Sequence, residues 1–209
     1  MEIPDTLPAR LYLLAYDARR GRLTARSKLA YLIRAAALVD LQLRGHLADE
    51  KGRPRAATAA SPVLDPVLES VLAEITVGKS RRWQRWVASN SRQTLRAVRD
   101  QLVTEKWIRI ETRRLLGLIP LTTVTVRDPR VLTRLVTLIR VALSPARPSS
   151  QVQPRDAALV ALAAAAELPT ALTRQQRREH RTRIAELADR TGPAVRALSH
   201  AYAADAAAV

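Results

Sequence analysis

The 209-residue sequence has no cysteine, no phenylalanine and only six glycines. The lack of cysteine excludes a disulfide framework, a thiolate metal site and a thiol nucleophile. The glycines are scattered singly, which excludes the phosphate-binding loops of P-loop and dinucleotide-binding proteins. Hydrophobic residues make up 47% of the chain, a globular composition. We therefore expect one domain spanning residues 1–209.

Long apolar runs are also missing. The longest, residues 157–166, is about half as long as a membrane-spanning helix needs to be. The N-terminal residues lack the basic and apolar regions of a secretory signal. We therefore expect a cytoplasmic protein that does not cross the membrane.

Acidic residues are scarce, with 19 Asp and Glu against 35 Lys and Arg, so the formal charge is +16. An excess of this size calls for an anionic partner, either nucleic acid or acidic lipid head groups. Residues 79–114 hold eleven cationic and three acidic residues, half of the excess. Within them Arg92, Arg96 and Arg99 share one helix face, where guanidinium groups either bind phosphate or simply form a solvated surface.

Hydrophobic spacing in most of the chain is helical, which predicts a mainly α, single-domain helical bundle. The pairs Asp65-Pro66 and Asp128-Pro129 are helix-start signals, and Gly45 is a helix-stop signal. Residues 157–168 are apolar on every helical face, which predicts a central buried helix. Residues 144–154 are rich in Pro and Ser, which predicts a loop.

Residues 107–126 depart from the helical pattern. They are rich in β-branched residues that alternate in polarity around a Gly/Pro tip, which predicts a β-hairpin and the only sheet element of the fold. Its apolar arm either packs on the protein's own core or a second subunit, or inserts into a membrane. The residues concerned are Leu115, Leu116, Leu118 and Ile119.

Catalytic and metal-binding patterns are weak. His46, His180 and His200 are dispersed, without the spacing of metal ligands on a helix. Asp49 and Glu50 precede a Lys-Gly-Arg-Pro run that predicts a solvated turn. We therefore expect no catalytic residue, no metal, no cofactor and no enzymatic activity.

Several motifs together resemble the Golgi phosphoprotein 3 family, in particular its bacterial, actinobacterial members. Their order and spacing along the chain carry the resemblance. The motifs are LYLL (11–14), GRLT (21–24), LVDLQLRGHL (38–47), DPVLESVL (65–72), LVTEKWI (102–108), LLGLIP (115–120) and RDAALVAL (155–162). The resemblance implies a helical bundle with a protruding hydrophobic hairpin, and eukaryotic members bind phosphatidylinositol 4-phosphate at the membrane surface.

In that family an aromatic residue and several arginines on a flat basic face hold the lipid phosphate. Arg34 and Arg92 match two of these arginines. Ala25 stands at the aromatic position and Leu95 at a third arginine position, with Arg96 beside it. The resemblance and the helix row together give four expected lipid-phosphate ligands on one exposed face: Arg34, Arg92, Arg96 and Arg99.

The leading expectation is a non-enzymatic, peripheral protein on the inner face of the membrane. It binds anionic lipid, a phosphoinositide or another acidic lipid, through these arginines, and the hairpin inserts beside them. A homo-oligomer is compatible with the sequence. The alternative is a winged-helix DNA-binding protein, since a basic helix over 91–104 followed by a hairpin is also the order of a recognition helix and its wing. An enzyme of unknown type ranks third.

Overall fold

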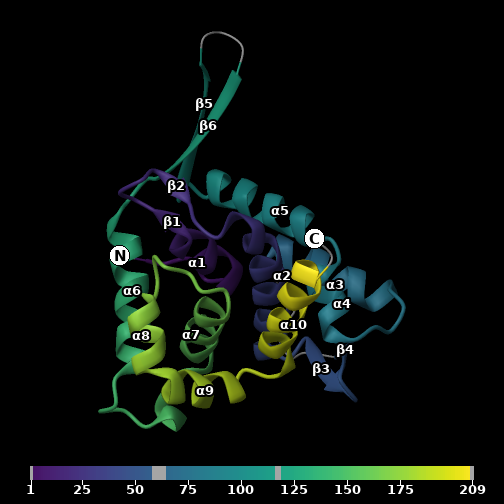
Figure 1. Ribbon diagram of the computed structural model, residues 1–209. Helices are drawn as coiled ribbons and strands as arrows, with labels where there is room; N and C mark the ends of the chain where they lie inside the picture. The colour runs from purple at the N-terminus through teal and green to yellow at the C-terminus, as the bar shows by residue number, and fades with distance from the viewer. Residues whose placement is uncertain (1, 58–64, 116–118, 208–209) are drawn as a thin grey trace.

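The computed structural model describes residues 2–57, 65–115 and 119–207, with the backbone alone at residues 26, 112–115 and 119–122. These residues form a mainly α fold with three small two-stranded sheets (Figure 1). The predicted fold class is confirmed. The expectation of a single sheet element is wrong, because two further hairpins have strands of only two and four residues, too short to show a periodic pattern.

The helices are α1 (Leu7–Leu14), α2 (Arg26–Leu43), α3 (Pro66–Val77), α4 (Trp83–Ala88), α5 (Ser91–Thr104), α6 (Arg130–Leu143), α7 (Pro154–Ala165), α8 (Arg174–Glu179), α9 (Arg181–Asp189) and α10 (Pro193–Ala207), with a 3-10 turn η1 (Ser149–Gln151). The strands are β1 (Tyr16–Asp17), β2 (Arg22–Leu23), β3 (Leu47–Glu50), β4 (Arg53–Ala56), β5 (Ile108–Leu115) and β6 (Ile119–Val126). They pair in chain order as antiparallel hairpins.

The local sequence signals explain where helices begin and end. The Asp65 carboxylate accepts hydrogen bonds from the backbone N–H groups of residues 67 and 68 at 3.0 and 3.2 Å, so α3 begins at Pro66 as predicted. Asp128 accepts from the Arg130 N–H at 2.9 Å, and α6 begins at Arg130. Gly45 follows α2 with φ of +78°, the left-handed conformation expected of a helix stop.

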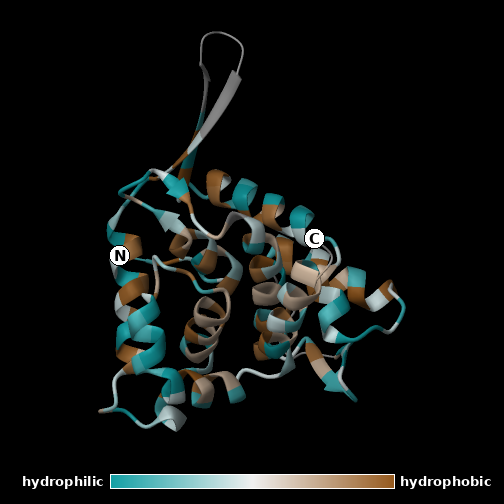
Figure 2. Ribbon diagram, in the orientation of Figure 1, coloured by the Kyte–Doolittle hydropathy of each residue, from teal (hydrophilic) through white to brown (hydrophobic). Residues whose placement is uncertain are grey.

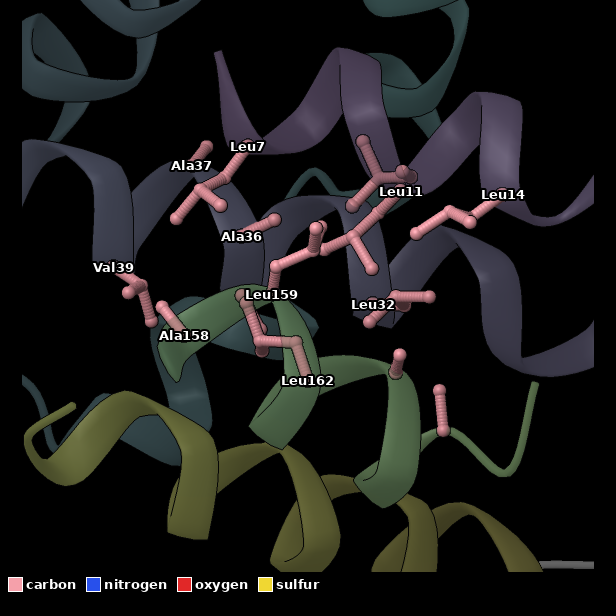
Figure 3. Close-up of a cluster of buried hydrophobic side chains, with 14 of the residues drawn as sticks. Leu7, Leu11, Leu14, Leu32, Ala36, Ala37, Val39, Ala158, Leu159 and Leu162 are labelled. Carbon is pink, nitrogen blue, oxygen red and sulfur yellow. The ribbon is translucent and has the colours of Figure 1, made fainter. Parts of the chain in front are cut away.

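The core is built around α2 and α7. Every residue of α2 from 32 to 41 is buried, and so is every residue of α7 from 157 to 163, which confirms the predicted central helix. Figure 3 shows side chains of α1, α2 and α7, among them Leu11, Leu32 and Leu159, meeting in one cluster. Alanines such as Ala36 and Ala158 keep the helices close at these contacts.

The hairpin β5–β6 projects from the helices at the end where α5 lies (Figure 1). The two strands are paired along their whole length. The register begins with Ile108 opposite Val126 at the base and ends with Leu115 opposite Ile119, which confirms the predicted hairpin. Ile108 and Val126 are buried and join the base of the hairpin to the core. Leu116 and Leu118 lie outside the described residues, as do the side chains of Leu115 and Ile119.

Candidate anion-binding site

The site is built on α5, whose two faces differ sharply in polarity. Its buried face consists of small and aliphatic residues at helical spacing, namely Ser91, Thr94, Val98 and Leu102. On other faces Arg92 and Arg96 are exposed and Arg99 is half-buried. Hydrophilic and hydrophobic residues alternate along this helix in Figure 2. Packing of the apolar face therefore fixes the direction in which the arginine row points.

A pocket of about 440 Å³ opens beside this row, and we call it the α5 pocket. It is bounded by α5, the first turns of α2, strand β2 and the base of β6. The residues that give it its chemistry are Arg92, Arg96, Arg99, Ser27, Tyr12 and Leu95. Three guanidinium groups and two hydroxyl groups at a partly apolar cavity are suited to a small anion with an uncharged extension.

The charge of the α5 pocket is only partly neutralised. Arg99 forms an ion pair with Asp100, with Nη2 2.7 Å from Oδ1. Arg92 and Arg96 make no hydrogen bond or ion pair with any other residue whose side chain the structure describes. Two guanidinium groups therefore remain available to an incoming anion.

Tyr12 contributes a buried phenol to the same pocket, and its side chain is 1% exposed. Burial raises the pKa of Tyr12 to about 12, and the nearby Arg99 opposes this rise. The phenol is therefore neutral at physiological pH and retains a proton to donate. Neither Tyr12 nor Ser27 could be predicted as part of this pocket from the sequence, because their segments approach α5 only through tertiary packing.

Arg34 does not belong to this site, which corrects the expectation of a shared exposed face. Its side chain is 0% exposed and pairs with Glu74, with Nη2 2.6 Å from Oε2. Its Nε donates to the Trp86 carbonyl at 3.2 Å, and its Nη1 donates to the Thr94 hydroxyl at 3.0 Å. Glu74 also accepts a hydrogen bond from Asn90 at 3.0 Å. The middle of α2 is enclosed by other helices, so a cation there must find its partners inside the protein.

The buried Arg34 network joins α2 to α3, to the end of α4 and to the first turn of α5. It therefore contributes to the packing of these helices, and none of its residues lines the α5 pocket. Leu95, at the position where the family resemblance implies a third arginine, forms part of the pocket wall. Ala25, at the aromatic position, precedes α2 in a left-handed conformation with φ of +51°.

Two further observations bear on the site. No helix among the described segments is long and apolar enough to cross a bilayer. Across the same segments, no three His, Cys, Asp or Glu side chains come together as a metal site would require.

Most of the chain matches a known protein family. The sequence model of the Golgi phosphoprotein 3 (GPP34) family matches residues 7–204. The match includes α5, the β5–β6 hairpin and all of the helices that enclose the α5 pocket. No curated protein matches the chain.

Proposed function

Because the chain belongs to the Golgi phosphoprotein 3 (GPP34) family, we propose that it is a non-enzymatic, peripheral membrane protein that binds anionic lipid head groups. The α5 pocket takes the lipid phosphate, with phosphatidylinositol 4-phosphate as the ligand that the family suggests. The observation that carries the proposal is the pocket itself, in which Arg92 and Arg96 stand unpaired beside the base of a projecting hairpin.

Two weak attractions acting together make this arrangement sufficient for membrane binding. Each arginine close to an anionic surface contributes about 1 kcal/mol. Apolar surface withdrawn from water adds about 25 cal/mol per Å². Stable attachment generally takes two such signals. In this proposal the arginines supply one of them, and Leu115, Leu116, Leu118 and Ile119 in the hairpin supply the other.

The direct test is co-sedimentation with phosphatidylcholine vesicles, alone or with phosphatidylglycerol or phosphatidylinositol 4-phosphate. The variant Arg92→Glu/Arg96→Glu reverses the two unpaired charges. The matched control is Arg174→Glu/Arg178→Glu, which makes the same change at the same spacing on exposed residues of α8, away from α5 in Figure 1. We expect the pocket variant to lose roughly tenfold or more in affinity for acidic vesicles. The control should bind as the parent does.

Both variants should melt close to the parent temperature, because exposed substitutions typically change stability by about 0.5 kcal/mol or less. Equal binding by the pocket variant and the control would reject the pocket as the lipid site. Duplex DNA serves as the competing ligand, since a helix followed by a hairpin is also the order of a winged-helix reader. Binding to DNA alone would favour that function instead. The logarithm of the binding constant should then fall with the logarithm of the salt concentration, with a slope of about −0.9 per phosphate contact.

A further inference from the structure

A second basic depression lies beside α4, and its arginines come from the basic stretch 79–114 noted in the sequence. It measures about 930 Å³ and is bounded by α4, the residues just before it, the end of α10 and one residue of α2. We call it the α4–α10 hollow. Its polar lining consists of Arg81, Arg82, Arg85, Gln84, Tyr31 and Asp205.

The hollow is strongly positive. Arg81, Arg82 and Arg85 are all exposed, and none of them pairs with a carboxylate among the described residues. Asp205 is the one carboxylate of the described lining, and it accepts a hydrogen bond from the Tyr31 hydroxyl at 2.9 Å. Three guanidinium groups therefore face one carboxylate that already has a donor, which leaves the hollow with a net positive charge.

The walls of the hollow are held in place by side-chain contacts between α4, α2 and α10. Trp86 is 4% exposed, and the Arg81 guanidinium lies over its ring with 5.8 Å between Cζ and the ring centroid. Gln84 donates to the His200 carbonyl at 3.3 Å and ties α4 to α10. Tyr31 packs edge-on against Tyr202, with ring centroids 6.0 Å apart. A cavity between such anchored helices is largely preformed, which lowers the ordering cost of binding.

The hollow adjoins the α5 pocket across α2. Ala30 lines the pocket and the next residue, Tyr31, lines the hollow. The hydrogen bond from Tyr31 to Asp205 raises the pKa of this phenol, and the nearby charge of Arg92 opposes the rise. The helix α10 packs against both α4 and α2, and α5 follows α4 directly in the chain. The two basic sites therefore form one band.

We propose that the α4–α10 hollow is a second subsite for lipid phosphate, so that one protein molecule holds two anionic lipids of the same membrane at once. This inference rests on the proposed function of the α5 pocket. Once one lipid is bound, the second binding event takes place within the complex, at an effective concentration in the millimolar range. The affinity then rises steeply with the fraction of acidic lipid.

The test compares three double variants of the full chain, each of which removes two exposed charges. Arg81→Gln/Arg85→Gln alters the hollow, Arg92→Gln/Arg96→Gln alters the α5 pocket, and Arg174→Gln/Arg178→Gln on α8 is the control. Binding is measured against phosphatidylcholine vesicles with increasing fractions of phosphatidylglycerol. Inorganic phosphate and duplex DNA are titrated separately.

We expect the hollow variant to lose about 25-fold in affinity for acidic vesicles, which corresponds to about 1 kcal/mol per arginine. The apparent cooperativity in acidic lipid should fall from about two to about one. The charge-preserving variant Arg81→Lys/Arg85→Lys should keep most of the affinity. If the hollow variant melts well below the parent, Arg85→Glu carries the test alone, since it leaves Arg81 on Trp86.

The outcomes separate the two proposals. Loss of binding in the α5 pocket variant with none in the hollow variant overturns the second subsite and leaves the proposed function standing. A parent that ignores acidic vesicles overturns both proposals. If the hollow variant loses only inorganic phosphate, the site takes free phosphate and not lipid. If it loses only DNA, the hollow is a nucleic-acid contact.

Discussion

Replacing Arg34 with Met should destabilise the fold without touching the membrane-binding surface. Removing one partner of a buried ion pair typically costs about 3–5 kcal/mol. Glu74 keeps 24% side-chain exposure and its hydrogen bond from Asn90. The cost of leaving its carboxylate without Arg34 is therefore near the lower limit of that range, about 3 kcal/mol. The Trp86 carbonyl also loses its bond from Arg34, at a cost of roughly 1 kcal/mol. The expected total is about 4 kcal/mol.

The measurement is urea unfolding of four proteins: the parent, Arg34→Met, Glu74→Leu and the double variant. Removing both charges leaves no unpaired ion, so the double variant should be more stable than Arg34→Met, with a coupling energy of about 2 kcal/mol or more. At a temperature where Arg34→Met remains folded, it should bind acidic vesicles as the parent does. A cost below about 1 kcal/mol, together with weaker vesicle binding, would refute the reasoning. It would make Arg34 a lipid ligand, as the family resemblance implies.

Three further expectations concern separate parts of the chain. Replacing Leu116 and Leu118 with Ser should weaken binding to acidic vesicles roughly tenfold or more and remove the part of the binding that resists high salt. The melting temperature should not change. A large fall in melting temperature would place the leucines in a packed core. Asp65→Ala should cost about 1 kcal/mol in urea unfolding, since α3 loses its N-cap, and an unchanged midpoint would contradict that role. Tyr12 holds its proton more tightly in the folded protein, with a pKa of about 12 against about 10 when unfolded, so stability should be full below pH 10 and decline toward pH 12. Tyr12→Phe should show a smaller decline between urea midpoints measured at those two limits, and identical declines would contradict the assignment.

Local chemistry predicted the elements whose cause lies within a few residues. The N-cap carboxylate of Asp65, the left-handed Gly45 and the row formed by Arg92, Arg96 and Arg99 depend only on helix geometry, so the sequence alone was enough to predict them. The β5–β6 hairpin was also predictable, because its eight-residue strands are long enough to show alternation.

Features that depend on distant partners were out of reach. Arg34 meets Glu74 forty residues further along the chain, and nothing near either residue indicates the pair. The hollow joins Tyr31 to Asp205 across 174 positions. Such contacts are set by how the helices pack, and an exposed arginine and a buried one look alike in a sequence.

The position of α2 has a consequence for synthesis of the chain. This helix leaves the ribosome well before α10, which packs against it through Tyr202 and Lys28. About 150 residues separate the two helices, and at about 5–20 residues per second the α2 surface that α10 covers stays exposed for roughly 8–30 s. During that interval the apolar surface of α2 is exposed on the nascent chain. A chaperone that holds unfolded chains, or transient contacts within the chain, must shield it. Truncated translation products should therefore aggregate or be degraded.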